Sequence, residues 1–271
     1  MTELHERPDG LLEASSSRAR VLVGPLDGGR LVSLRIDGAE VLGGTVPAPG
    51  APPEIFSGSF VMAPFVGRTA NGRFEFEGRE WALPVNFGDH AIHGFVFDRP
   101  WTRRGDGLEI AFDERWPFGG SVRQEFDLGE TSLTVRAIVS NGDRRMPVIV
   151  GFHPWFAERL SDGRRARLDF RPGTHYVTDS SGIPTGTAAG SGRRPWDDSF
   201  TDVESDPVIR WDGGPELTLG RTGSHWIVCE TMPGAVCVEP LSGPVNGLAT
   251  GAYTVVGPGS PLIHSLTITW R

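Results

Sequence analysis

Lysine is absent from this 271-residue chain, so all 26 of its basic residues are arginines. Without lysine, catalysis through a Schiff base on a lysine side chain is excluded. A surplus of positive charge is missing too, because the formal net charge is −8. The arginines are scattered apart from short pairs, so the sequence indicates no stripe for binding a phosphate backbone, and we expect no nucleic-acid partner.

Cysteines and long apolar runs are also scarce. The two cysteines, Cys229 and Cys237, show neither a CxxC motif nor a Cys/His metal spacing. We expect two buried thiols in a reducing cytosol. No stretch approaches the roughly 20 apolar residues of a membrane span, and the first ten residues lack the apolar core of a signal peptide. These absences predict a soluble, cytoplasmic protein with no membrane partner.

Helical periodicity is the third absence, since no amphipathic window exceeds about two turns. The 37 glycines and 22 prolines instead separate many short apolar or alternating segments, which is typical of strands joined by turns. We predict an all-β chain, folded as one large antiparallel β-sandwich over residues 18–271 after a loose lead-in at 1–17. The clearest expected strands are 20–23, 31–36, 74–77, 108–112, 122–126, 133–139, 148–152, 167–170, 216–219, 226–229, 235–238 and 262–270.

Three of these expectations can be checked closely. Residues 133–139 alternate between polar and apolar, which predicts a sheet with one wet face. Residues 148–152 are apolar throughout and predict one buried strand, and the alternating segment 262–270 is expected to close a sheet. The Pro- and Gly-rich stretch at 48–53 is expected to be a loop.

Titratable residues stand beside apolar runs or glycines in four segments: 67–73, 89–95, 151–156 and 237–240. Glu239 ends a buried-looking strand, where a carboxylate is costly unless it has a partner or turns into solvent. His153 follows an apolar strand, where a histidine serves either as a packed structural residue or as a catalytic one. His93 precedes a glycine, where the backbone can bend and approach a ligand closely.

Other chemistries remain open from these residues alone. His90 and His93 could bind a metal with Glu239 if they lie on a loop, because an offset of three places them on opposite faces of a strand. A glycosidase would need two facing carboxylates, for which Asp197 and Asp198 are weaker candidates beside Glu239. No GxSxG element and no glycine-rich phosphate loop is present.

Taken in order, these segments resemble the aldose 1-epimerase (galactose mutarotase) family, in its broader bacterial branch. The resemblance rests on His93-Gly94 with Trp101 after it, on Gly151-Phe152-His153-Pro154-Trp155-Phe156, on Trp196-Asp197-Asp198-Ser199-Phe200-Thr201 and on Ala235-Val236-Cys237-Val238-Glu239-Pro240. Arg68 precedes His93 by an interval (93 − 68 = 25) similar to that of the family's sugar-binding arginine. The segments run in family order from about Arg20 to the C-terminus.

The resemblance implies a galactose mutarotase-like supersandwich that interconverts the α and β anomers of a hexose such as glucose or galactose. It implies Glu239 as the base at the anomeric hydroxyl, His153 as the acid at the ring oxygen and His93 as a further hydrogen-bonding residue. Arg68 and Asp197 would bind the remaining hydroxyls. Because the reaction moves two protons and breaks one C–O bond, it needs a base, an acid and positioning, with no metal or cofactor.

Departures from the family pattern leave the substrate open. Gly67 stands where an asparagine is usual, and His93-Gly94-Phe95 lacks a double glycine. A phosphorylated or modified sugar, or a sugar-binding sandwich without catalysis, therefore remains an alternative. Asp197 and Asp198 are not separated by the pattern, nor is a monomer from a homodimer. Trp155, Phe65 and Phe95 are candidates for stacking on the sugar, although most aromatic residues of this kind pack in the core.

Overall fold

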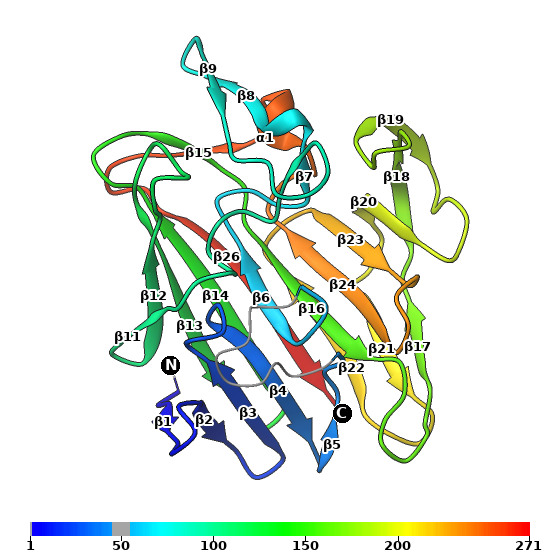
Figure 1. Ribbon diagram of the computed structural model, residues 1–271. Helices are drawn as coiled ribbons and strands as arrows, with labels where there is room; N and C mark the ends of the chain where they lie inside the picture. The colour runs from blue at the N-terminus through cyan, green and yellow to red at the C-terminus, as the bar shows by residue number, and fades with distance from the viewer. Residues whose placement is uncertain (1, 45–54) are drawn as a thin grey trace.

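Two large antiparallel sheets dominate the computed structural model, which describes residues 2–44 and 55–271 (Figure 1). The larger sheet has twelve strands within the described residues. They are ordered β1 (His5–Glu6), β2 (Leu12–Ser15), β3 (Ala19–Gly24), β4 (Arg30–Ile36), β6 (Ser59–Met62), β16 (Gly151–Ala157), β24 (Ala235–Leu241), β23 (His225–Cys229), β20 (Asp197–Val203), β18 (Pro172–Thr178) and β19 (Pro184–Ala189), with β5 (Ala39–Glu40) paired to β4.

The smaller sheet has eight strands in the described part of the chain. They are ordered β11 (Thr102–Arg104), β12 (Gly107–Ala111), β13 (Ser121–Leu128), β14 (Ser132–Ser140), β26 (Leu262–Trp270), β22 (Glu216–Arg221), β21 (Val208–Trp211) and β17 (Ala166–Asp169). One hydrophobic cluster joins inward-facing residues of both sheets, such as Leu34 and Val238 from the larger and Val135 and Ile268 from the smaller. The predicted all-β, antiparallel sandwich is therefore confirmed.

Short elements gather at one end of the sandwich, at the top of Figure 1. They are the pairs β7 (Arg68–Thr69) with β10 (Ala91–Ile92), β8 (Arg73–Phe76) with β9 (Arg79–Ala82) and β15 (Met146–Val148) with β25 (Thr254–Val256), the 3₁₀ turn Ala70–Gly72 and the four-residue helix α1 (Gly247–Thr250). The hairpin β18–β19 projects at the same end. Among the described residues, no helix is long and apolar enough to cross a membrane.

Alternation along β14 follows from its position between the core and solvent. Its nine residues alternate strictly between half-buried and buried, and the buried ones face the other sheet. Burial of each aliphatic side chain contributes roughly 1.5–3 kcal/mol, so the pattern fixes which face turns inward. The prediction of one wet face for residues 133–139 is confirmed.

Three other expectations are wrong, and a fourth lies outside the described residues. The lead-in at 1–17 contains β1 and β2, whose Leu12 and Ala14 are buried in the core, so it is not loose. The apolar run 148–152 is not one strand, because it leaves β15 at Val148 and enters β16 at Gly151. β26 lies inside its sheet, between β14 and β22, and does not close an edge. The loop expected at 48–53 falls outside the described residues.

Candidate active site

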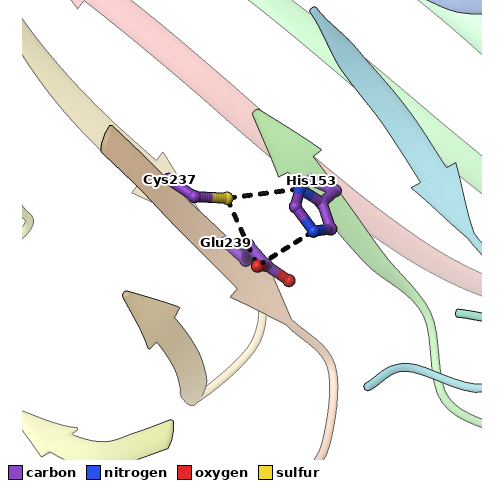
Figure 2. A group of neighbouring side chains, drawn as sticks. All are labelled: His153, Cys237 and Glu239. Atoms are coloured by element: carbon purple, nitrogen blue, oxygen red, sulfur yellow. Dashed lines mark hydrogen bonds and ion pairs between the residues drawn. The ribbon is translucent and has the colours of Figure 1, made fainter. Parts of the chain in front are cut away.

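His153 on β16 and Glu239 on β24 face each other across the middle of the larger sheet. The two strands are antiparallel neighbours, with Gly151 opposite Leu241 and Trp155 opposite Cys237. Position 153 therefore lies opposite position 239, on the face turned away from the inter-sheet core. His153 Nε2 is 3.3 Å from Glu239 Oε1, and both side chains are almost fully buried (Figure 2). The sequence brings an imidazole and a carboxylate into contact from 86 residues apart (239 − 153 = 86).

Cys237 completes a triangle with this pair. Its Sγ is 3.2 Å from His153 Nδ1 and 3.2 Å from Glu239 Oε1, while Glu239 Oε2 points away from both partners (Figure 2). Two positions apart on β24, Cys237 and Glu239 share a face of the sheet. Sequence reasoning missed this contact, although the i, i+2 spacing of the two residues along a strand could have indicated it.

His93 contacts His153 from the turn that directly follows β10. Its backbone has φ +60°, a strained value for a residue with a Cβ, and its N–H donates to the Gly67 carbonyl (3.0 Å). Gly94 follows at φ +73°, where a Cβ would lie 2.0 Å from the Ala63 carbonyl oxygen, so only glycine fits there. The imidazoles of His93 and His153 meet edge to face, with ring centroids 4.9 Å apart. This strained turn holds the second imidazole beside the first.

Arg68 is held at the other side of the site by β7, which pairs with β10 through Arg68 and Ile92. Asn246 fixes this segment, because its Oδ1 accepts from the Ala70 N–H (2.9 Å) and its own N–H donates to the Arg68 carbonyl (3.0 Å). The guanidinium lies over Phe87, 5.1 Å from the ring centroid. The turn signal Asn246-Gly247 was available in the sequence, but its connection to Arg68 was not.

A cleft of about 740 Å³ joins these residues. All five predicted site residues line it: Arg68, His93, His153, Asp197 and Glu239. Three of these lining residues carry buried polar atoms that have no hydrogen-bond partner, namely Arg68 Nε, His93 Nδ1 and Glu239 Oε2. Because buried polar atoms are nearly always paired, three such atoms around one cleft indicate a polar ligand.

Asp197 and Asp198 are separated by the pleat of β20. Asp197 pairs with Cys229, which pairs with Cys237 on the next strand, so Asp197 shares the face that carries Glu239. Asp198 pairs with Val228, a buried residue of the inter-sheet core, and so belongs to the opposite face. Partial burial raises the pKa of Asp198. Both residues border the cleft, and the register favours Asp197 for a ligand placed over Glu239.

One of the three candidate stacking residues lies at the cleft, and the other two pack in the core, as expected for most of them. Trp155 borders the cleft and donates from Nε1 to the Ile55 carbonyl (2.7 Å), but Phe65 and Phe95 pack against each other in the inter-sheet core. Phe56 and Phe87 take their place at the cleft. Sequence reasoning could not separate these phenylalanines, because a strand or loop position does not reveal which side of a sheet it meets.

Burial shapes the charges of the site. Loss of hydration raises the pKa of Glu239 to about 8, a rise that the Cys237 hydrogen bond partly opposes and nearby Asp197 reinforces. Loss of hydration also holds the pKa of His153 well below its usual value, and the pKa of His93 falls to about 3 with help from Arg68. At neutral pH the Glu239–His153 pair therefore carries one proton between its two groups.

Potential metal ligands come together at one place in the described residues, at His153, Cys237 and Glu239. Cys237 Sγ lies 3.2 Å from Nδ1 of the imidazole and Glu239 Oε1 lies 3.3 Å from Nε2, so each of the two contacts a different ring nitrogen. The set considered from sequence, His90 with His93 and Glu239, lines the same cleft but forms no such cluster of ligand atoms among the described residues, and His90 Nδ1 accepts from the Asn71 N–H (3.1 Å). This donor pattern fits proton transfer better than metal binding.

Comparisons with known proteins agree with this geometry. The sequence model of the aldose 1-epimerase family matches residues 11–207. The protein YphB of Escherichia coli K12 is 32% identical over 104 residues, which span 36% of each of the two chains. The match therefore covers about a third of that curated relative's length.

Solved structures show the same fold. A galactose mutarotase-like protein from Clostridium acetobutylicum superposes with a TM-score of 0.85 at 16% identity, covering 100% of this chain and 98% of the other. A galactose 1-epimerase from Lactobacillus acidophilus NCFM superposes with a TM-score of 0.77 at 14% identity, over the same shares of the two chains. At these identities the likeness establishes the supersandwich fold and nothing finer.

Proposed function

The chain belongs to the aldose 1-epimerase family, and from this premise we propose that it is a mutarotase acting on an uncharged hexose such as glucose or galactose. The observation that carries the proposal is the contact between Glu239 Oε1 and His153 Nε2 at the floor of a cleft large enough for a pyranose. A carboxylate and an imidazole in contact supply the base and the acid that mutarotation requires.

The proposed reaction keeps one proton on the pair in every state. From the tautomer with ionised Glu239 and protonated His153, Glu239 takes the proton of the anomeric hydroxyl while His153 gives its proton to the ring oxygen. The C1–O5 bond breaks and leaves an open-chain aldehyde, with Glu239 protonated and His153 neutral. Rotation about C1–C2 and reversal of both transfers close the ring on the other face. No metal, redox group or covalent intermediate enters the balance.

Proton sharing explains how the resting site can begin this sequence. At rest the proton lies on Glu239, since burial raises the pKa of Glu239 to about 8 and lowers the pKa of His153. A shift across the 3.3 Å contact converts one tautomer into the other. The pair is therefore a single titrating unit with one proton, and the assignment of acid and base reverses with the direction of the reaction.

His93, Arg68 and Asp197 are proposed to hold the sugar. His93 lies edge-on to His153, where Nδ1 can reach the ring oxygen or the anomeric oxygen. Arg68 presents its unpaired Nε from one wall of the cleft, and Asp197 presents a carboxylate from the other. Fixing the hydroxyls keeps the opened chain close to both proton-transfer groups.

Charge at the cleft supports an uncharged substrate over a phosphorylated one. Asp89, Asp179, Asp197 and Asp198 border the cleft, and Arg68 is the one arginine among the described residues that line it. A phosphate there would meet more negative than positive charge, which is unfavourable in a partly desolvated site. The asparagine that is usual in the family at position 67 would not fit in this chain, because a Cβ there would lie 2.8 Å from the Val245 side chain.

Relaxation of freshly dissolved α-sugars tests the proposal. Polarimetry or NMR should show faster equilibration of neutral hexoses than of hexose phosphates, with the rate unchanged by EDTA. Saturable binding of a hexose without any exchange of anomers would instead identify a non-catalytic sugar-binding protein. A faster rate with phosphorylated sugars would overturn the assignment of substrate class but not the reaction.

A further inference from the structure

Cys237 contacts both proton-transfer groups without lining the cleft. Its side chain is completely buried in the middle of β24, below the level at which a ligand would lie. The thiol bridges His153 Nδ1 and Glu239 Oε1 at 3.2 Å each, as the dashed lines in Figure 2 show. The proposed reaction gives this thiol no proton to carry, so its role has to be positional.

Hydrogen-bond direction around the triangle follows from proton counting. A thiol has one proton to donate and a sulfur that accepts weakly. The Cys237 S–H donates to Glu239 Oε1, an oxygen that can accept both in the ionised carboxylate and in the resting, protonated carboxyl. The sulfur is then left as the acceptor at Nδ1, which requires the proton of the His153 ring to lie on Nδ1. Nε2 is free to exchange a proton with Glu239 and with the substrate.

We propose that Cys237 is a positioning residue that fixes His153 in the Nδ1–H form and orients Nε2 and Oε1 toward the cleft. This inference rests on the proposed function for its catalytic consequence, although the tautomer itself does not depend on it. A partner at the distal nitrogen is the usual way in which a protein fixes the tautomer and orientation of a working imidazole. Here a thiol would take the place more often held by a carboxylate or a carbonyl.

A thiol suits this position because it stays neutral. Burial beside Glu239 raises the pKa of Cys237 well above its usual value, so the group remains an S–H donor across the working range. A carboxylate in its place would put a second negative charge against Glu239. Because the thiol does not titrate in this range, only Glu239 and His153 exchange the proton.

Other charged or titratable groups face the triangle from the surrounding elements. His93 meets His153 edge-on, and Asp197 approaches from β20. Arg30 lies on the far side of Phe60, which stacks on His153 with centroids 4.6 Å apart. These groups remain in place in any Cys237 variant, so a change seen in such a variant is due to the thiol.

Cys229 offers a matched control. It lies directly opposite Cys237 on β23, and its Sγ contacts Thr231 Oγ1 at 3.5 Å. No hydrogen bond or ion pair joins Cys229 to His153 or Glu239 in the described residues. Removal of this thiol therefore changes the cysteine content and the packing of the same sheet, but leaves the triangle intact.

The first test is the tautomer of His153, measured by long-range ¹H–¹⁵N NMR on the full chain. The His153→Gln variant assigns the signals. Wild type and Cys229→Ala should show the proton on Nδ1, Cys237→Ala should show a mixed or reversed tautomer, and Cys237→Ser should restore Nδ1–H. A proton on Nε2 in wild type, or an unchanged tautomer in Cys237→Ala, overturns the inference whether or not the protein is a mutarotase.

The second test is kinetic and separates positioning from packing. We expect Cys237→Ala to lower kcat by about 10–100-fold, with KM within about twofold of wild type because the thiol does not touch the sugar. Cys237→Ser should recover most of the loss, and the high-pH limb of the kcat profile should move in the alanine variant only. Wild-type kcat and an unmoved limb in Cys237→Ala contradict the role. No catalysis by wild type would instead count against the proposed function, while leaving the tautomer result standing.

Discussion

The two large sheets use burial in different ways. In the smaller sheet β14 alternates strictly between half-buried and buried residues, because one face packs on the core and the other meets solvent. In the larger sheet all seven residues of β16 are buried, including His153, because the inter-sheet core covers one face and the cleft-end elements cover the other. The candidate site therefore lies where neither face of the sheet is open to solvent.

This difference explains where chemistry can be placed. A polar residue on the wet face of β14 keeps its hydration and needs no partner within the protein. A polar residue on the covered face of β16 or β24 loses its hydration and must depend on neighbouring groups. His153 and Glu239 contact each other and Cys237, and it is their loss of hydration that raises the pKa of Glu239 and lowers the pKa of His153.

Glu239→Gln should give the largest effect and sharpen the comparison most. It removes the proposed base while keeping the size of the side chain, so we expect kcat to fall by about 10²–10⁴-fold. The matched control is Glu125→Gln on β13 of the smaller sheet, where the carboxylate forms an exposed-face ion pair with Arg123. Mutarotation assays should find the control at the wild-type rate, and equal losses in both variants would break the comparison.

Ile268→Ala should affect stability and leave the site intact. Ile268 is completely buried in β26, so its truncation should lower the free energy of unfolding by about 2–5 kcal/mol. Thr269→Ala changes the neighbouring exposed position and should cost less than about 0.5 kcal/mol. Urea unfolding measures both values. A kcat of folded Ile268→Ala far below wild type would show that the two sheets are not functionally separate.

Arg68→Met tests the wall of the cleft. The substitution keeps an unbranched side chain over Phe87 but removes every donor, so sugar binding should weaken and KM should rise by roughly tenfold, the equivalent of about 1–2 kcal/mol for a charged hydrogen bond. Arg123→Met on the smaller sheet is the control. An unchanged KM together with a large fall in kcat would assign Arg68 to the chemical step.

The pH dependence of stability offers the most direct measure of the burial of Glu239. Glu239 holds its proton up to a pKa of about 8 in the folded protein but ionises near its ordinary value when unfolded. Its contribution to stability is therefore fully present below the unfolded pKa and is lost as pH rises toward 8, by roughly 1 kcal/mol per pH unit.

Thermal unfolding of wild type and Glu239→Gln between pH 5 and 8 checks this sign. The stability of the variant relative to wild type should increase as pH rises, because glutamine has no proton to lose. Glu125→Gln on the smaller sheet should show no such trend. A difference between Glu239→Gln and wild type that stays constant with pH would contradict the raised pKa.

The sequence predicted the smaller sheet better than the larger one. Alternation in residues 133–139 placed β14 and its wet face, because solvent imposes a period of two. The same reasoning joined β15 to β16, since a segment buried on all sides has no period that marks where a strand ends. The buried strands in the lead-in were missed because β1 and β2 are short and partly polar.

The candidate site was predicted by resemblance and not by pattern. The five predicted residues do line one cleft, but the spacing of Glu239 and His153 along the chain does not reveal that they are cross-strand neighbours. Cys237 and Asn246 were overlooked, because each acts through contacts with segments distant in sequence. Of the three candidates for stacking, Trp155 borders the cleft, while Phe65 and Phe95 pack in the core, as expected for most of them.

The sequence by itself determined the alternating strands, the absence of long helices and the residue types available for acid–base chemistry, because these depend on local composition and period. Only the tertiary structure decided that a carboxylate, an imidazole and a thiol share one buried face. That outcome depends on the register of β16 against β24 and on the elements that cover them. Desolvation, which gives these groups their altered proton affinities, exists only once the chain has folded.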